Sequence, residues 1–310
     1  MDGIINVHKP PGMTSHDVVS FIRRTFRQKR VGHTGTLDPG VAGVLPICLG
    51  KATRVAQFLT DQDKAYRGEL TLGFTTDTLD GFGQFTGEKD ASRLTEDEIR
   101  QALVGFIGEI EQIPPMVSAV RHQGKKLYEL ARAGVEVERR PRKVTIHSLE
   151  ILEIEGLSTA HPKVSFDVVC SKGTYIRTLC DDIGARLGVG GYMSHLVRTR
   201  SGPFTLATAH PLEIIEEAVQ TGNYQQVVLA IESGLTHLLS VKVWDSAVKA
   251  VSHGNPLFEP GVAEKPETLQ EGQLIRLHGL NEEILAVAKV IFEQKDNQTK
   301  IIFQPIVVFI

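Results

Sequence analysis

The 310-residue sequence lacks the features that mark membrane, secreted and metal-binding proteins. No apolar run is long enough to span a bilayer, and Met1–Gly3 does not supply the basic start of a signal peptide. The three cysteines, Cys48, Cys170 and Cys180, are odd in number and form no Cys-x-x-Cys pair. We therefore expect buried thiols in a reducing cytoplasm, with no disulfide, no metal site and no membrane partner.

Net charge is also small, −3 at pH 7, which argues against a general nucleic-acid-binding protein. The charge is unevenly distributed, however. Residues 1–34 carry six Lys/Arg against two acidic residues, and residues 121–143 carry eight against three. Residues 77–111 carry nine acidic residues against three basic ones. Separate basic and acidic faces are typical of a protein that binds a polyanion on one part of its surface. Solvated charges scattered over the surface would give the same counts.

Length and composition are those of an ordinary globular protein, with 41% hydrophobic and 23% charged residues. A chain of this length holds one large domain, or a large domain and a small one. The composition changes near residue 240, where Trp244–His253 predicts a helix that ends at a glycine. Three strand-like runs follow it, at residues 272–277, 283–292 and 299–309. The sequence therefore predicts a first domain over residues 1–239 and a second over residues 240–310.

The most informative stretch, residues 32–40, reads Gly-His-Thr-Gly-Thr-Leu-Asp-Pro-Gly. Its glycines allow positive φ and close backbone approach, and Pro39 restricts Asp38 to an extended conformation. The pattern predicts one carboxylate on a tight, exposed loop that precedes the buried strand Val44–Leu49. An aspartate before proline in such a turn is ordinarily only a turn-former, so the single residue is weak support for catalysis.

The whole phrase from Gly32 to Pro39 resembles the catalytic loop of the TruB family of tRNA pseudouridine synthases. In that family the aspartate is the indispensable catalytic group, and the resemblance assigns this role to Asp38. It implies an α+β fold, in which a pseudouridine synthase catalytic domain surrounds a central, mainly antiparallel sheet with the active site in a cleft across it. Residues 272–277 and 285–288 resemble a small PUA-type β-barrel, an RNA-binding module, at the C-terminal end.

The opening motif lies at residues 9–15, Lys-Pro-Pro-Gly-Met-Thr-Ser, and resembles that of the same family. The resemblance implies that Lys9 and Pro10 give structural support to the catalytic loop. Thr14 or Ser15 is expected to cap a helix with apolar residues at helical spacing. Basic residues gather at the end of this helix, where they complement the dipole or contact phosphates.

A strand is predicted at residues 64–73, where apolar side chains alternate with a period of two. Tyr66 lies on its apolar face, and a tyrosine there is ordinarily a core residue with its hydroxyl at the rim. The Lys-x-Tyr start and the Thr-Asp-Thr-x-Asp phrase at residues 76–80 resemble the family's second motif. There the tyrosine stacks on the target uracil and is a candidate base for the C5 proton, a role that falls on Tyr66.

Residues 170–179 resemble the motif whose arginine pairs with the catalytic aspartate. An arginine in a first helical turn is unfavourable for the helix dipole, which itself suggests a carboxylate partner for Arg177. The resemblance implies that Arg177 holds Asp38 ionised and oriented by a two-point contact. Residues 195–202 resemble the last site segment, which places Leu196 against the uracil. For Arg198 and Arg200 we weigh RNA contact and a structural role equally.

Two further segments are expected to bind RNA. His33 resembles the family histidine that inserts where the flipped nucleotides were stacked, and we favour this role over general acid–base catalysis. Residues 112–140 resemble the thumb insertion that folds over the tRNA arm, with a basic amphipathic helix at residues 124–134. We expect three of its side chains to contact phosphates: Lys125, Lys126 and Arg132.

Pseudouridine formation breaks the N1–C1′ bond of uridine and reattaches the base through C5, so no electrons are exchanged and no group is imported. We therefore expect no cofactor and no metal. The target must be flipped out of its loop, and a carboxylate must act on the sugar or the ring. Three roles stay open for Asp38: attack at C1′, attack at C6 and abstraction of a C2′ proton.

The resemblance implies a monomeric isomerase that acts on uridine 55 in the T-loop of tRNA, with the tRNA T-arm as its partner. Guide-RNA-dependent relatives share the catalytic motifs, and the thumb-like segment favours an enzyme that works without guide RNA. Two other classes stay open: a non-catalytic tRNA-binding or folding protein on the same scaffold, and a nucleoside-cleaving hydrolase. Intact Asp38, Tyr66 and Arg177 argue against the first as the sole function, and no second acid is evident for the second.

Overall fold

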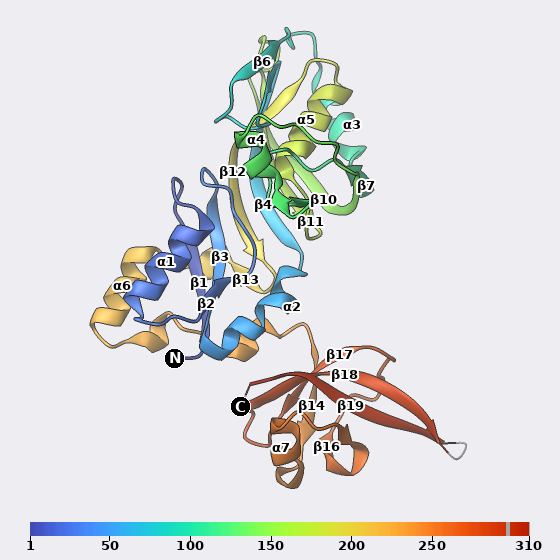
Figure 1. Ribbon diagram of the computed structural model, residues 1–310. Helices are drawn as coiled ribbons and strands as arrows, with labels where there is room; N and C mark the ends of the chain where they lie inside the picture. Colours follow the sequence, from blue (N-terminus) through green and yellow to red (C-terminus); the bar gives the residue numbers. More distant parts are fainter. Residues whose placement is uncertain (296–297, 310) are drawn as a thin grey trace.

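The computed structural model describes residues 1–295 and 298–309 and arranges them around two large sheets (Figure 1). The first is nine-stranded and the second six-stranded. Figure 1 shows the first sheet running through the long part of the molecule and the second forming a separate unit at one end, near the N-terminus. No helix in the described part of the chain is long and apolar enough to cross a membrane.

The first sheet confirms the predicted central, mainly antiparallel arrangement. Its main path runs β1 (Gly3–Lys9), β3 (Ala42–Leu49), β12 (Gly191–Ser201), β4 (Lys64–Leu72), β11 (Lys163–Cys170), β10 (Arg142–Glu155) and β7 (Gly108–Gln112). Two short strands lie off this path: β2 (Val31–His33) pairs with β3, and β13 (Phe204–Thr205) pairs with β12. Every pair is antiparallel except β3 with β12, which is parallel and joins only Ala42 to Val197 and Gly43 to Arg198. The two halves of the sheet therefore meet along a very short seam.

Helices cover the sheet at both ends (Figure 1). The longer ones beside it are α1 (Ser15–Thr25), α3 (Glu96–Val104), α5 (Ile176–Arg186) and α6 (Leu212–Gln220). Thr14 caps α1, because its side chain accepts from the Asp17 amide while the Asp17 carboxylate accepts from Thr14. Thr95 makes the same reciprocal cap on α3 with Glu98. The apolar stripe of α1 then packs into the main core, as the helical spacing predicted.

The second sheet is the barrel-like C-terminal unit expected from the sequence. Its order is β15 (Leu257–Phe258), β19 (Gln298–Val308), β18 (Ile284–Lys295), β17 (Leu274–His278), β14 (Leu239–Val243) and β16 (Val262–Glu264), with α7 (Asp245–Ser252) beside it. The predicted helix and three strands are confirmed, whereas the short strands β14, β15 and β16 were not predicted. Ile284, Val287 and Phe309 share one buried cluster with Ile4 and Val44 of the first sheet. The two sheets are thus joined by apolar packing.

The remaining elements are short and lie in connections. They are β5 (Phe74–Thr76), β6 (Phe85–Glu88), β8 (Arg121–His122), β9 (Lys125–Lys126), α2 (Ala56–Thr60), α4 (Leu127–Arg132) and the 3₁₀ turns Gly50–Arg54, Leu206–Thr208, Tyr224–Gln226, Ile231–Gly234 and Glu259–Gly261. One prediction needs correction here. The thumb helix expected at residues 124–134 is shorter, because residues 125–126 pair with 121–122 in a small hairpin.

Candidate active site

Asp38 lies in the connection between β2 and β3, residues 34–41, which we call the Asp38 loop. The loop is held from the side of α1. The Ser15 hydroxyl accepts a hydrogen bond from the Leu37 amide at 2.8 Å and donates one to the Leu37 carbonyl at 3.2 Å. Ser15 and Leu37 are both buried, so these bonds are shielded from water. Leu37, the residue before Asp38, is therefore held in place by Ser15, the first residue of α1.

Lys9 holds the other side of the Asp38 loop. Its side chain is fully buried, and its ammonium donates to three carbonyl oxygens, those of Pro10 at 2.9 Å, Met13 at 2.6 Å and Pro39 at 3.2 Å. Burial lowers the pKa of Lys9 to about 8, against a partial opposing pull from Asp38. The geometry agrees with the supporting role expected of Lys9 and Pro10, because one cation ties the opening motif to the residue that follows Asp38.

Arg177 is buried and meets Asp38 at a single point. Its Nη2 lies 3.0 Å from Asp38 Oδ2 and also donates to the Val117 carbonyl at 2.8 Å. Its Nη1 donates to the Thr78 carbonyl at 3.1 Å and lies 3.8 Å from Asp80 Oδ2. The expected two-point contact is therefore not what the structure shows. One edge of the guanidinium is taken by a backbone carbonyl and a second carboxylate.

The surroundings shift the titration of Asp38. Burial raises the pKa of this carboxyl above its ordinary value, Arg177 opposes the rise, and Asp80 adds to it. The expectation that Arg177 holds Asp38 ionised is thus refined, because the arginine limits a rise that desolvation causes. A carboxylate with a raised pKa is a stronger base and nucleophile than an ordinary surface aspartate.

Arg198 is a site residue whose role the sequence did not reveal, since RNA contact and a structural role were weighed equally for it. It is 1% exposed, and its guanidinium donates to three carbonyl oxygens: Val44 at 2.7 Å, Thr36 at 3.4 Å and Gly35 at 3.3 Å. A Cβ at Gly43 would overlap the Arg198 backbone, so glycine is required where the two strands meet. Arg198 therefore joins the Asp38 loop to β3 and lies beside the strand that carries Tyr66.

Tyr66 lies opposite Arg198 on the neighbouring strand β4. Burial raises the pKa of its phenol, and Arg198 acts against that rise. The Tyr66 side chain lines a cavity. Sequence alternation identified the strand, but the nearness of Arg198 to Tyr66 comes from the pairing of β12 with β4, which local sequence does not encode.

One cavity of about 510 Å³ brings four of the predicted residues together: Asp38, Tyr66, Arg177 and Leu196. Its lining also includes four basic residues, Lys64, Arg142, Lys143 and Lys172. We call it the Asp38 cavity. Among the lining residues that the structure describes, the other predicted ones are absent, namely His33, Lys9, Pro10, Lys125, Lys126 and Arg132.

His33 lies in β2, next to the Asp38 loop. Its Nδ1 accepts a hydrogen bond from the Gly35 amide at 3.3 Å, and burial lowers the pKa of the imidazole. A neutral ring is therefore favoured near pH 7. This agrees better with a stacking role than with a protonated general acid.

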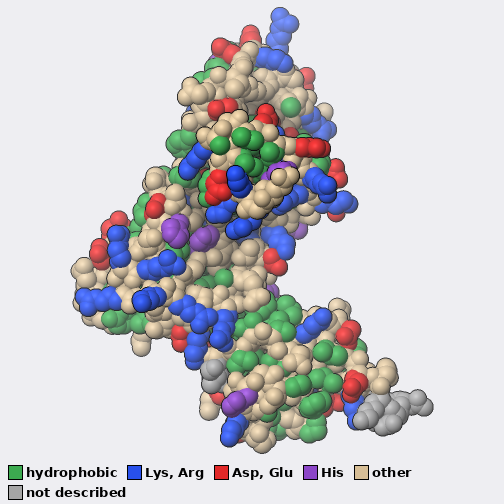
Figure 2. All heavy atoms as spheres, viewed as in Figure 1, with side chains coloured by type: hydrophobic (Ala, Val, Ile, Leu, Met, Phe, Trp, Pro, Cys, Tyr) green, Lys and Arg blue, Asp and Glu red, His purple; other side chains and the backbone are tan. Residues whose placement is uncertain are grey.

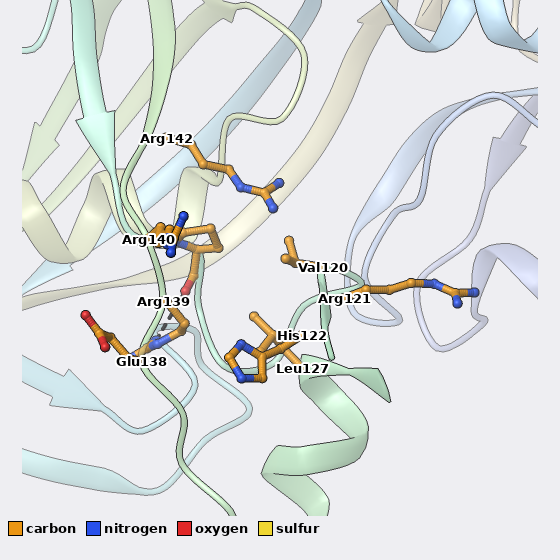
Figure 3. A pocket seen from close by; sticks show the side chains of 9 residues that line it. Val120, Arg121, His122, Leu127, Glu138, Arg139, Arg140 and Arg142 are labelled. Atoms are coloured by element: carbon orange, nitrogen blue, oxygen red, sulfur yellow. Dashed lines mark hydrogen bonds between the residues drawn. The ribbon is translucent and has the colours of Figure 1, made fainter. Parts of the chain in front are cut away.

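The thumb segment, residues 112–140, encloses a second cavity of about 280 Å³ (Figure 3). Arg121, Arg140 and Arg142 line it together with His122, over an apolar wall that includes Val120 and Leu127. In Figure 3, Arg142, Arg140 and His122 surround the opening and Arg121 extends to one side. We call it the arginine cavity. Arg142 lines both cavities, so the two adjoin.

The three predicted thumb residues lie elsewhere on this segment. The side chains of Lys126 and Arg132 lie over the Tyr128 ring, 5.3 and 5.5 Å from its centre, and Lys125 is exposed. Figure 2 shows Lys and Arg side chains gathered over the thumb and again around α1. The sequence signal for the arginines was the count of eight basic residues in 121–143, which does not say which of them share a cavity.

Known proteins match the whole chain. The N-terminal domain of TruB family pseudouridylate synthases matches residues 23–176, and the tRNA pseudouridylate synthase B C-terminal domain matches residues 177–236. The tRNA pseudouridine synthase B of Pelotomaculum thermopropionicum is 49% identical over 308 residues, covering 99% of this chain and 97% of its own. That of Symbiobacterium thermophilum is 60% identical over 213 residues, covering 69% of this chain and 71% of its own.

Solved structures agree. A Cbf5-Nop10-Gar1 complex superposes with a TM-score of 0.78 at 35% identity, over 99% of this chain and 85% of that one. An H/ACA RNP bound to a substrate RNA containing 2′-deoxyuridine gives the same TM-score at 33% identity and the same coverage. Taken with the site, these matches define the class of the protein, which is a pseudouridine synthase and therefore an isomerase. At 49% identity over almost its whole length, the chain belongs to the TruB family of pseudouridylate synthases.

These two neighbours come from RNA-containing assemblies and cover 99% of this chain, so the expectation that the thumb-like segment marks an enzyme without guide RNA stays a prediction.

Proposed function

We propose that this chain, acting as a monomer and without a guide RNA, isomerises uridine to pseudouridine at position 55 in the T-loop of tRNA. The Asp38 cavity carries the proposal, because it unites a carboxylate 3.0 Å from Arg177 with the Tyr66 ring and the Leu196 side chain. Its volume of about 510 Å³ lies in the range of sites that enclose a small ligand.

The proposed chemistry begins with a flipped uridine whose base enters between Tyr66 and Leu196. The Asp38 carboxylate acts on the sugar or the ring while the N1–C1′ bond breaks, and the walls keep the freed uracil captive. A C5–C1′ bond then forms, C5 loses its proton and N1 gains one, so atoms and electrons balance. The phenolate form of Tyr66 is assigned as the acceptor of the C5 proton. Arg198 supports that role, since its charge opposes the rise that burial causes in the pKa of Tyr66.

The assignment of tRNA as the substrate rests on relatives and on charge. The relatives at 49% and 60% identity are named tRNA pseudouridine synthase B, whereas the H/ACA and Cbf5 chains are 33–35% identical. This difference supports tRNA modification without a guide. The arginine cavity and the predicted contacts Lys125, Lys126 and Arg132 would neutralise phosphates of the T-arm. His33 is assigned to stack where the flipped nucleotides had been, which suits its neutral ring.

The proposal divides the chain into a catalytic domain at residues 1–239 and a PUA-like RNA-binding domain at residues 240–310. Each part has its own sheet, which supports this division. The shared apolar cluster around Ile4 and Phe309 supports a fixed placement of the second domain on the first. A bound tRNA would then meet one continuous, rigid surface.

The test is incubation with an unmodified tRNA transcript, followed by carbodiimide mapping of pseudouridine. A transcript with cytidine at position 55 and the Asp38→Asn protein serve as controls. We expect one new pseudouridine at position 55 with the wild-type protein and none with either control. Tight binding without any pseudouridine would instead identify a non-catalytic tRNA-binding protein. Modification at another position, or only after addition of a guide RNA, would overturn the proposed specificity.

A further inference from the structure

Phe82 is an aromatic side chain left open beside the Asp38 loop. It is 76% exposed, more than the other exposed large apolar side chains of the described residues. Its ring nevertheless has a fixed neighbour, because a Cβ at Gly40 would overlap it. Gly40 lies two residues after Asp38. One side of the ring thus rests on the backbone of the loop that carries the carboxylate, while most of its surface faces solvent.

The backbone that presents Phe82 is well anchored. The Phe82 amide donates to Asp80 Oδ1 at 3.0 Å, and the Gly81 amide donates to the Met193 carbonyl at 3.1 Å. Asp80 is 9% exposed, and its other oxygen lies 3.8 Å from Arg177 Nη1. The position of the ring is therefore set by the same carboxylate that faces the Asp38–Arg177 pair. An anchored yet exposed phenylalanine is hydrophobic surface, most of which has no intramolecular partner.

Phe85, three residues on, is a natural comparison. It is also 63% exposed, but its ring packs against two other aromatic rings, Phe74 at 4.9 Å and Tyr192 at 5.9 Å between centres. For Phe82 no such aromatic pair exists among the described residues. Phe85 is thus part of a local aromatic cluster, whereas the Phe82 ring is available to a ligand.

We propose that Phe82 is a stacking platform for an unpaired RNA base that adjoins the nucleotide held in the Asp38 cavity. This proposal rests on the proposed function, which brings a folded RNA loop to that cavity. Flipping a nucleotide disrupts the stacking of its neighbours, and a displaced base is stabilised when it lies on an aromatic side chain. Stacking needs no hydrogen bonds, so Phe82 contributes affinity and orientation with little dependence on base identity. Phe82 is accordingly a substrate-positioning residue.

The test measures binding of an unmodified tRNA transcript in the Asp38→Asn background, where no turnover intervenes. The variants are Phe82→Ala, Phe82→Trp and Phe82→Leu, with Phe85→Ala as the matched control. Loss of one stacked base weakens binding by roughly 5- to 150-fold, so Phe82→Ala should fall in this range. Phe82→Trp should bind as well as the parent, and Phe82→Leu should resemble the alanine variant because it keeps apolar volume without an aromatic face. Phe85→Ala should bind like the parent.

A fluorescent base reports the contact directly. In separate transcripts, 2-aminopurine replaces each nucleotide that flanks the target. At one of these positions its fluorescence should be quenched by the protein that retains Phe82, and less by Phe82→Ala. Equal affinity for the alanine variant and the parent, full rescue by leucine, or an equal loss in Phe85→Ala would each overturn the proposal. Thermal melting of each variant separates these results from misfolding. Failure of the proposed function looks different, since the wild-type protein would then form no pseudouridine at all.

Discussion

The Asp38 loop and the thumb segment are both connections, yet they are held in opposite ways. Three buried side chains hold the loop: Lys9, Ser15 and Arg198 together donate to or accept from its backbone at several points. The thumb is tied to the rest of the protein near its start, where the Gln112 side chain exchanges hydrogen bonds with the Tyr175 backbone and the Val117 carbonyl accepts from Arg177. Its basic side chains are mostly exposed. The difference teaches that reaction geometry is fixed before the substrate arrives, whereas the basic surface is free to adjust to it.

The largest effect should come from Asp38→Asn, which removes the carboxylate that we propose to be catalytic and leaves the basic surface intact. We expect turnover to fall by about a thousandfold or more, with tRNA binding nearly unchanged. Pseudouridine formation and a filter-binding Kd, measured on the same preparation, check this. Residual turnover near the wild-type level would remove Asp38 from the chemistry. A matching loss of binding would show that the loop also grips the RNA.

Arg177 variants come next, because they alter the carboxylate without removing it. Both Arg177→Met and Arg177→Lys should lower turnover by about a hundredfold, since lysine cannot reach Asp38, Val117 and Thr78 together. Pseudouridine formation at saturating tRNA measures the loss. Near-complete rescue by lysine would show that charge alone, without the shape of the guanidinium, is what Asp38 requires.

The pH dependence of activity tests the direction in which Arg177 shifts the pKa of Asp38. Asp38 must be ionised, so activity is lost as pH falls through its raised pKa, at a higher pH than for an ordinary aspartate. Removal of Arg177 takes away an influence that lowers the pKa, so the acid limb of Arg177→Met should move to still higher pH. An unmoved or downward-shifted limb would contradict this account of Asp38.

Arg198→Met should harm both stability and rate, because it removes the hydrogen-bond donor of three carbonyls, those of Val44, Thr36 and Gly35, the first of them in a buried bond. We expect a loss of about 3 kcal/mol in the free energy of unfolding, from urea denaturation. Turnover per folded molecule should fall by about tenfold, since the Asp38 loop is then held by Lys9 and Ser15 alone. Arg200→Met, at the more exposed arginine of the same strand, is the matched control. Equal effects at both positions would leave Arg198 without a special role.

The thumb residues should change affinity more than chemistry. Replacing Lys125, Lys126 and Arg132 with alanine should weaken tRNA binding and flatten its salt dependence, by roughly one unit of log–log slope for each phosphate that is no longer neutralised. The Arg121 and Arg140 pair, which lines the arginine cavity, should do the same by up to about two units. An unchanged slope in either variant would mean that those side chains belong to a merely solvated face.

Local sequence patterns predicted much of the fold. Period-two alternation identified the strand that carries Tyr66, and the glycine-rich phrase identified the Asp38 loop. Contacts between distant segments were beyond such reasoning. The role of Arg198 depends on the seam between β3 and β12, and the one-point contact of Arg177 depends on carbonyls at Thr78 and Val117 that compete with Asp38. The thumb helix was overextended because residues 125–126 pair with 121–122 instead.

The most direct test of the contrast between loop and thumb is single-turnover pseudouridine formation at saturating tRNA by the Arg121→Ala/Arg140→Ala protein. These two arginines line the arginine cavity and not the Asp38 cavity. We predict a raised Kd and a single-turnover rate close to that of the wild type, because the reacting geometry is set by buried residues elsewhere. A rate that falls as far as that of Arg177→Met, with tRNA still saturating, would contradict the account.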